Sequence, residues 1–251
     1  MQIQIEDDPA ALGREAGKKA AYLIRQAIAT NGEAHIILAT GASQFETLKR
    51  LVLEKNIAWN KVVMFHLDEY IGLPESHNAS FRKYLKERFL DLVPALKAVY
   101  LINGENDPVA ECRRINTLIL KYPIDVALVG IGENGHLAFN DPPADFEIED
   151  PYIIVHLDQD CRRQQMGEGW FNALEEVPEK AISMSIRQIL KSKSIVCSVP
   201  DKRKAVAIKN CLEGEISNQF PASILQDHQN CICFLDKDSA SLLSKHVIAT
   251  T

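Results

Sequence analysis

The chain alternates between segments whose apolar residues recur every three or four positions and short runs that are almost wholly apolar. The first pattern is typical of helices that cover a core with one face, and the second of strands buried on both faces. The first helix is predicted between Asp8-Pro9 and Asn31-Gly32, because these pairs suit a helix start and a helix end. Further helices are predicted at about 44–55, 80–92 and 108–121, and one that begins near residue 201. Strands are predicted at 34–39, 61–67, 99–101, 125–129, 152–156, 181–184, 194–199 and 231–235.

The order of these elements indicates the fold class. Most of the strands are separated by helices, which predicts an α/β fold: a three-layer, largely parallel, doubly wound (Rossmann-like) sheet with helices on both faces. The sequence shows no linker, internal repeat or low-complexity tract, so residues 1–251 are expected to form a single domain. With 46% apolar residues, a chain of this length can bury a large core.

Charge and cysteine spacing exclude several classes of protein. A net charge of -6 gives no general attraction to nucleic acid or to anionic membranes, so a bound phosphate would need a local pocket. The first residues do not resemble a signal peptide, and no apolar run approaches the roughly 20 residues that span a bilayer, so a soluble cytoplasmic protein is expected. The six cysteines lack CxxC spacing, which favours buried reduced thiols, with Cys231 and Cys233 on one face of a strand, over a zinc site or disulfides.

Polar residues follow three of the predicted strands. In a parallel sheet, ligands bind outside the carboxyl ends of the strands, so these positions are the first candidates for a site. Thr40-Gly41-Ala42-Ser43 follows the first strand, Asp68-Glu69-Tyr70 the second, and the segment from Gly130 through Pro142 the fourth. In the first of these, two hydroxyl residues flank a glycine before a helix whose free N–H groups suit a phosphate.

The third segment is the most informative of the three. Its glycines let the backbone approach a ligand closely, and an imidazole, His136, precedes a carboxylate, Asp141, by five residues, a combination that can move protons at neutral pH. The same letters match the dinucleotide pattern G-x-G-x-x-G. However, Pro142 and Pro143 deny the segment the helix that this pattern requires, so we expect a smaller ligand and no nicotinamide or flavin cofactor.

Each candidate residue has a plainer interpretation. Ser43 could only cap its helix, Asp68 could cap a turn, and His136 could be a hydrogen-bonded structural imidazole. Three separate structural reasons at one sheet edge are less economical than one shared pocket.

The three segments together resemble the glucosamine-6-phosphate deaminase (isomerase) family, within a superfamily that includes 6-phosphogluconolactonases and sugar-phosphate sensor domains. The resemblance covers residues 38–43, 65–73 and 130–142, in the order and approximate spacing of the family. The lactonases typically have Asp-Glu-Arg and Gly-His-Thr where this chain has Asp68-Glu69-Tyr70 and Gly135-His136-Leu137.

The resemblance implies conversion of D-glucosamine 6-phosphate and water to D-fructose 6-phosphate and ammonia, by ring opening, proton transfer from C2 to C1 and loss of the amine. It implies that His136 is the ring-opening base, that Asp141 orients the imidazole, and that Asp68 removes the C2 proton. The implied partner is a small amino-sugar phosphate, and neither a metal nor an organic cofactor is implied. The sequence leaves open whether the chain forms a homo-oligomer.

Two residues depart from the family pattern. Many members carry Asp where this chain has Asn134 and Glu where it has Asp141. Asn134 can still orient an imidazole by hydrogen bonding, but we expect the histidine's surroundings to hold one fewer negative charge and to stabilise the imidazolium less.

For the phosphate, the resemblance points to Lys204, which would form a cradle with residues 40–43. Without the resemblance, a solvated lysine is equally acceptable. Gly132 and Glu69, from the matching segments, are further candidate substrate contacts. The family's phosphate-binding arginine would fall within 166–170, where this chain has none, so Arg162 or Arg163 is a candidate substitute.

Some relatives have an effector site just beyond the third segment. Residues 144–150 are acidic here and would repel a phosphate, so we expect no activation by N-acetylglucosamine 6-phosphate.

Alternative functions are lactone hydrolysis, in which His136 activates water, and a sugar-phosphate sensor without turnover. Because only a short segment precedes the first helix, we expect no DNA-reading module, and the presence of both Asp68 and His136 favours turnover. Isomerisation without deamination also stays open.

Overall fold

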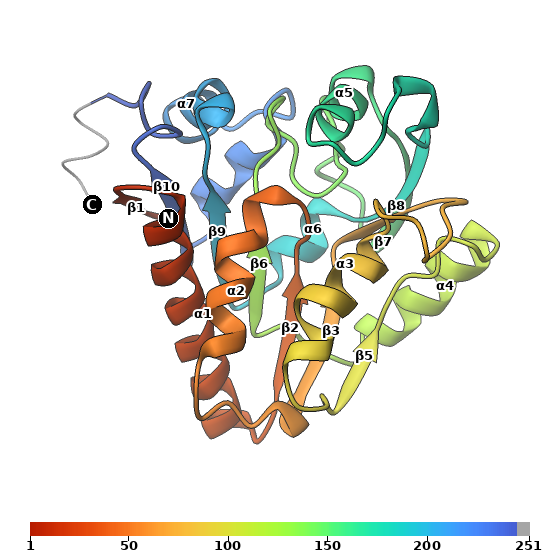
Figure 1. Ribbon diagram of the computed structural model, residues 1–251, viewed down its shortest axis with the longest axis vertical. Coiled ribbons are helices and arrows are strands. Elements are labelled where there is room, and N and C mark those ends of the chain that lie inside the picture. Colours follow the sequence, from red (N-terminus) through yellow and green to blue (C-terminus); the bar gives the residue numbers. More distant parts are fainter. Residues whose placement is uncertain (245–251) are drawn as a thin grey trace.

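The computed structural model describes residues 1–244, so residues 245–251 of the expected domain lie outside its described part. Seven strands form one sheet in which all neighbouring strands run parallel, in the order β1-β10-β9-β6-β2-β3-β5 (Figure 1). The predicted α/β class is confirmed. The strands of this sheet are β1 Gln2–Glu6, β2 Ala34–Leu38, β3 Val62–His66, β5 Ala98–Tyr100, β6 Val126–Val129, β9 Ser194–Val199 and β10 Cys231–Asp236.

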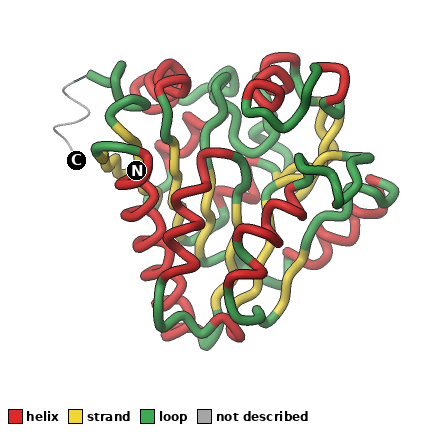
Figure 2. The backbone as a smooth tube through the Cα atoms, viewed as in Figure 1, coloured by secondary structure: helices red, strands yellow, loops and turns green. Residues whose placement is uncertain are grey.

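Helices lie on both sides of this sheet and cover it (Figure 2). The first helix begins and ends as the sequence predicts, because the Asp8 carboxylate accepts a hydrogen bond from the Ala11 N–H (2.7 Å) and Gly32 adopts a left-handed conformation. The α-helices are α1 Pro9–Asn31, α2 Phe45–Leu53, α3 Phe81–Arg88, α4 Pro108–Ile119, α5 Gln159–Gly167, α6 Ile186–Leu190 and α7 Ala205–Glu213. The 3-10 helices are η1 Ala42–Gln44, η2 Trp59–Lys61, η3 Leu90–Leu92, η4 Leu174–Glu176, η5 Lys202–Lys204 and η6 Pro221–Asp227.

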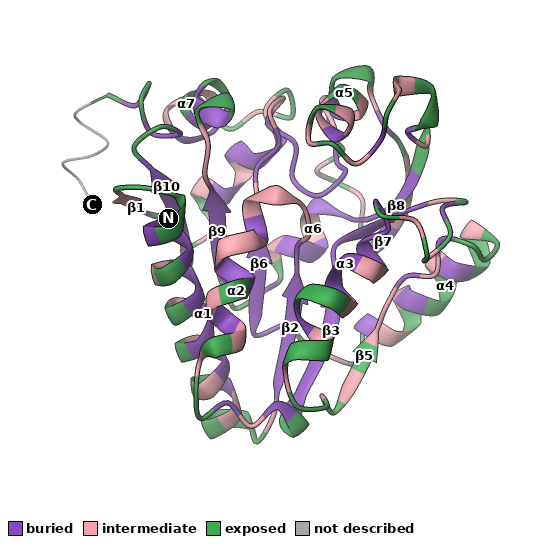
Figure 3. Cartoon of the chain, viewed as in Figure 1, coloured by how far each residue is buried: buried purple, intermediate pink, exposed green. Residues whose placement is uncertain are grey.

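The central strands are buried on both faces (Figure 3). On one face they contact α1 and α2, which pack so closely that a Cβ on Gly13 would lie 2.3 Å from the Cβ of Glu46. On the other face they contact α4, α6 and α7. Every residue of β2, β3 and β6 is buried, which explains why the sequence shows these strands as continuous apolar runs.

A second, antiparallel sheet corrects the predicted topology. It consists of β4 Asp68–Tyr70, β8 Lys180–Met184 and β7 Tyr152–His156, in that order. From the sequence pattern, β7 and β8 were predicted in the parallel sheet, and β1 and β4 were not predicted. An apolar run does not reveal its pairing partner, and β4 is short and begins with two carboxylates, which are rare in strands.

The cysteines and the helix lengths bear on two further expectations. All six cysteines lie in the described part of the chain and are unpaired; five are buried and Cys112 is partly exposed. No helix among residues 1–244 is long and apolar enough to cross a membrane.

The strand order creates a crevice at the carboxyl edge of the parallel sheet, near the top of Figure 1. From β2 the chain proceeds outward to β3 and β5, whereas β6 returns to the opposite side of β2. The loops that follow β2 and β6 therefore turn to opposite faces of the sheet. A site for a small ligand is expected between such loops.

Candidate active site

An open cleft of about 540 Å³ occupies this crevice. Its walls include the loop after β2, the residue that opens β4, the loop after β6, and the 3-10 helix η5. The start of α3 and the end of α5 also contribute, so six separate parts of the sequence meet at one place. The residues that line the cleft are Ala39, Thr40, Gly41, Ala42, Ser43, Leu67, Asp68, Phe81, Gly130, Ile131, Gly132, His136, Ala138, Phe139, Gln164, Gln165, Glu168 and Lys204.

Asp68 presents an unpaired carboxylate to the cleft. It is the first residue of β4, pairs with Ser183 of β8 through the backbone, and is 7% exposed. No protein donor in the described part of the chain hydrogen-bonds its carboxylate, so this side chain does not cap a turn. Burial, with a smaller contribution from the charge of Glu69, raises the pKa of Asp68 to about 8. A carboxylate in these surroundings can accept a proton near neutral pH.

Glu69 points away from the cleft. Its fully buried carboxylate accepts hydrogen bonds from the hydroxyl of Ser80 (3.0 Å) and from the backbone N–H of Arg82 (2.9 Å), and it forms an ion pair with the Arg82 guanidinium (3.3 Å). Glu69 therefore holds the start of α3 in place. It does not line the cleft, so the structure does not place it where a substrate contact was predicted.

The loop after β6 holds His136 against Gly132. The Gly132 N–H donates a hydrogen bond to the His136 carbonyl (3.0 Å), and the imidazole lies so close that a Cβ on Gly132 would be 2.2 Å from Cε1. Any other residue at position 132 would displace the ring. His136 is 8% exposed, and no described residue forms a hydrogen bond with its Nε2.

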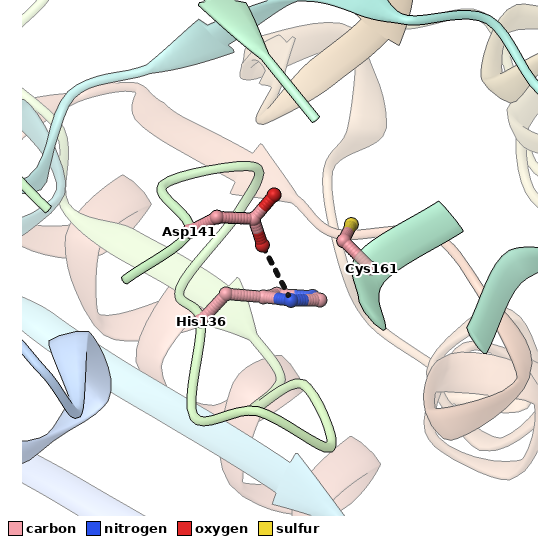
Figure 4. A group of neighbouring side chains, drawn as sticks. All are labelled: His136, Asp141 and Cys161. Atoms are coloured by element: carbon pink, nitrogen blue, oxygen red, sulfur yellow. Dashed lines mark ion pairs between the residues drawn. The ribbon is translucent and has the colours of Figure 1, made fainter. Parts of the chain in front are cut away.

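Asp141 is the acidic partner of this imidazole. His136 Nδ1 and Asp141 Oδ1 are 3.2 Å apart, close enough for an ion pair but at an angle that does not give a good hydrogen bond (Figure 4). Burial alone would raise the pKa of Asp141. His136, the Asp158 N–H (3.0 Å) and the Asn134 amide (3.1 Å) outweigh burial and hold this pKa below its ordinary value. Asp141 is therefore ionised beside the imidazole.

The Asn134 side chain hydrogen-bonds the Asp141 carboxylate and not the imidazole ring of His136. Its side-chain N–H₂ donates to Asp141 and to Asp158 (3.2 Å), and its Oδ1 accepts a hydrogen bond from the backbone N–H of His136 (3.1 Å). Asp158 supplies a second carboxylate behind the amide, and Asn134 itself carries no charge. The expectation of one fewer negative charge here than in relatives with Asp at this position stays a prediction. No motif selects Asp158, which lies 17 residues beyond Asp141.

Cys161 of α5 completes this cluster. One ligand atom from each of His136, Asp141 and Cys161 lies within 4.8 Å of the others, and imidazole, carboxylate and thiol are groups that can bind zinc (Figure 4). Metal binding requires the thiolate. Burial first, and then the charge of Asp141, raises the pKa of this fully buried thiol well above its ordinary value, so the cysteine is better suited to donate a hydrogen bond to Asp141.

Lys204 is the cation of the cleft. It ends η5 beside the loop of residues 40–43 and is only 5% exposed, so it is not a solvated surface lysine. No acidic side chain in the described part of the chain lies within 4 Å of its ammonium. Burial lowers the pKa of Lys204, whereas the charges of Glu168 and Glu133 oppose this shift. Ser43, next to it, caps neither η1 nor α2.

The two candidate arginines lie outside the cleft. The Arg162 guanidinium donates to the carbonyls of Leu174 (2.8 Å) and Val177 (2.9 Å), and the exposed Arg163 pairs with Asp160 (2.8 Å). Neither replaces a phosphate-binding arginine here. The side chains from this region that do line the cleft are Gln164, Gln165 and Glu168, none of which the sequence pattern selects. Gln164 and Glu168 are spaced i, i+4 at the end of α5, which is a signal only once the orientation of the helix is known.

The fold and cleft define a class: a doubly wound α/β protein with an acid–base group and one buried cation at the carboxyl edge of its parallel sheet. Within that class, the chain belongs to the family described as glucosamine-6-phosphate isomerases/6-phosphogluconolactonase, whose model matches residues 7–234. It is 36% identical to a glucosamine-6-phosphate deaminase of Streptococcus uberis over 91% of this chain and 95% of the relative. With that of Lacticaseibacillus paracasei it shares 34% identity over 98% and 100%.

Solved structures agree with this assignment. A monomeric glucosamine-6-phosphate deaminase superposes with a TM-score of 0.88 at 32% identity, covering 96% of this chain and 100% of that one. A 6-phosphogluconolactonase from Thermotoga maritima has a TM-score of 0.78 over 94% and 99%, but only 15% identity, which shows a common fold alone.

Proposed function

We propose that this protein is a glucosamine-6-phosphate deaminase, which converts D-glucosamine 6-phosphate and water to D-fructose 6-phosphate and ammonia. The observation that supports this function best is that Asp68 at the start of β4 and His136 in the loop after β6 line one cleft together with Lys204, whose ammonium has no acidic side chain within 4 Å among residues 1–244. The close relatives carry the same activity in their names. The proposal includes residues 1–251 as one domain and a cytoplasmic location.

The phosphate lies between Lys204 and the loop of residues 40–43. The lysine supplies a desolvated positive charge, and the backbone N–H groups at the start of η1 supply donors that need no side chain. Binding at this end leaves the sugar carbons to extend toward Asp68 and His136.

His136 is the acid–base group that opens the sugar ring. The imidazole takes the proton of the anomeric hydroxyl and returns a proton to the ring oxygen as the C1–O5 bond breaks, which gives the open-chain aldehyde. The ionised Asp141 stabilises the imidazolium in between, and the amide of Asn134 keeps this carboxylate in place.

Asp68 then transfers a proton between carbons. Its carboxylate removes the C2 proton while the aldehyde oxygen takes up a proton from solvent, which gives an enolamine. Asp68 then returns its proton to C1, and the nitrogen lone pair forms the C=N bond of a protonated imine at C2. Water adds to the imine, and ammonia leaves. A base with a pKa of about 8 holds the proton long enough to return it and is still ionised in part at neutral pH.

Ammonia release tests this function. We expect the wild type to release ammonia from glucosamine 6-phosphate and to leave 6-phosphogluconolactone intact, and both Asp68→Asn and His136→Gln to be severely impaired. The opposite substrate preference would favour the lactonase alternative. Saturable binding of glucosamine 6-phosphate without any product would favour the sensor.

A further inference from the structure

The corner of the cleft beside Lys204 also contains a carboxylate, that of Glu168. Glu168 follows the last turn of α5. One of its oxygens accepts a hydrogen bond from the Gln164 side chain (2.8 Å), and the other from the Trp170 indole (3.2 Å). Both donors are neutral. No lysine or arginine nitrogen of residues 1–244 lies within 4 Å of it, so its negative charge is held in place without a cationic partner.

This carboxylate faces the loop that would hold a phosphate. Glu168 Oε2 lies 3.9 Å from the position that a Cβ on Gly41 would occupy, and the loop of residues 40–43 lines the same cleft. The charge of Glu168 is also the strongest acidic influence on Lys204. Lys204 and Glu168 therefore place opposite charges beside the same small part of the cleft.

We propose that Glu168 is a specificity-determining residue that selects against the second negative charge of a phosphate ester. This inference rests on the proposed function, because it assigns a phosphate to the corner beside Lys204. Like charges that share a partly desolvated site repel each other more strongly than in water. Affinity for the substrate phosphate is therefore set below what Lys204 and the loop alone would give, and it falls as the phosphate becomes a dianion.

Neutralising Glu168 tests the proposal. Glu168→Gln keeps the size of the side chain and removes its charge, and Glu175→Gln is the matched control, because Glu175 is a glutamate of η4 outside the cleft. At pH 8 we expect Glu168→Gln to lower the KM for glucosamine 6-phosphate about tenfold and to leave kcat unchanged. Glu175→Gln should match the wild type. An unchanged or raised KM in Glu168→Gln would overturn the proposal.

A binding measurement separates this inference from the proposed function. Calorimetric titration with inorganic phosphate needs no turnover, so it remains decisive even if the wild type releases no ammonia. We expect Glu168→Gln to bind phosphate about tenfold more tightly than the wild type at pH 8, and the advantage to shrink at pH 5.5, where phosphate is a monoanion. Glu168→Ala should show the same trend, which removes any dependence on the hydrogen bonds of the glutamine. Equal affinities of wild type and both variants at pH 8 would refute the role of the charge.

Discussion

The first residue of β4 and the loop after β6 each hold a largely buried carboxylate: Asp68 lines the cleft, and Asp141 pairs with His136. The pKa values of the two carboxylates are shifted in opposite directions. Asp68 has no hydrogen-bond donor among the described residues, and burial raises its pKa to about 8. Asp141 is also buried, but an imidazole, an amide and a backbone N–H hold its pKa below the ordinary value. Because their surroundings move the two pKa values apart, we infer different roles for the two carboxylates: Asp68 exchanges protons, and Asp141 stays ionised to support His136.

Removing the proton-exchanging carboxylate is expected to have the largest effect. Asp68→Asn should lower kcat by about 10²- to 10⁴-fold, because an amide cannot accept the C2 proton. Ammonia release measures this loss, and circular dichroism checks that the variant is folded. Activity within twofold of the wild type would remove Asp68 from the mechanism.

The same variant should be more stable than the wild type at high pH. The pKa of Asp68 is 3.8 when the side chain is freely solvated and about 8 in the fold, so both states hold the neutral acid below pH 3.8. Between these two pKa values the unfolded chain ionises first, and the folded state loses stability as pH rises, by an amount on the order of a few kcal/mol. Asn has no such loss. Urea unfolding at pH 5 and pH 8 should therefore show a stabilisation by Asp68→Asn that grows with pH; a constant difference would mean an ordinary pKa at this site.

The pH dependence of catalysis should follow the same group. As a base, Asp68 acts when ionised, so kcat/KM should rise from pH 6 to about pH 8, roughly tenfold per unit below its pKa. Initial rates at saturating and limiting substrate measure this limb. A plateau that begins below pH 6 would contradict the raised pKa.

Asn134→Asp tests the other carboxylate. The substitution would place a third negative charge beside Asp141 and Asp158 and remove both amide donors. We expect a loss of about 1–3 kcal/mol in unfolding free energy, larger at pH 8 than at pH 5 because the repulsion needs ionised groups. Asn134→Ser is the control, since it removes the donors without adding charge and should lose similar stability at both pH values.

The smallest effect on the rate is expected from adding N-acetylglucosamine 6-phosphate. The loop beyond the third segment, where some relatives bind an effector, contains Glu147 and Glu149, which pair with Arg187. Acidic residues in this loop do not favour a phosphate, so N-acetylglucosamine 6-phosphate should leave the rate curve hyperbolic and unshifted. Sigmoidal kinetics that this compound relieves would show an effector site.

The residues of the cleft differ in how far the sequence could predict them. Thr40, Asp68 and His136 follow continuous apolar runs, and the carboxyl ends of parallel strands meet at one edge, so their convergence could be predicted from pattern alone. Glu69 and Arg162 could not be placed in this way. Whether a side chain of β4 or α5 faces the cleft depends on the antiparallel pairing with β8 and on the orientation of α5, and neither leaves a periodic signal in so short a segment.

The proton that Asp68 moves can be followed directly. Glucosamine 6-phosphate that carries deuterium at C2 should lose the label to water, or transfer it to C1, with the wild type. Asp68→Asn should leave the C2 deuterium in place over the same time, as monitored by NMR. Loss of the C2 deuterium at the wild-type rate in Asp68→Asn would contradict the assignment of Asp68 as the group that exchanges this proton.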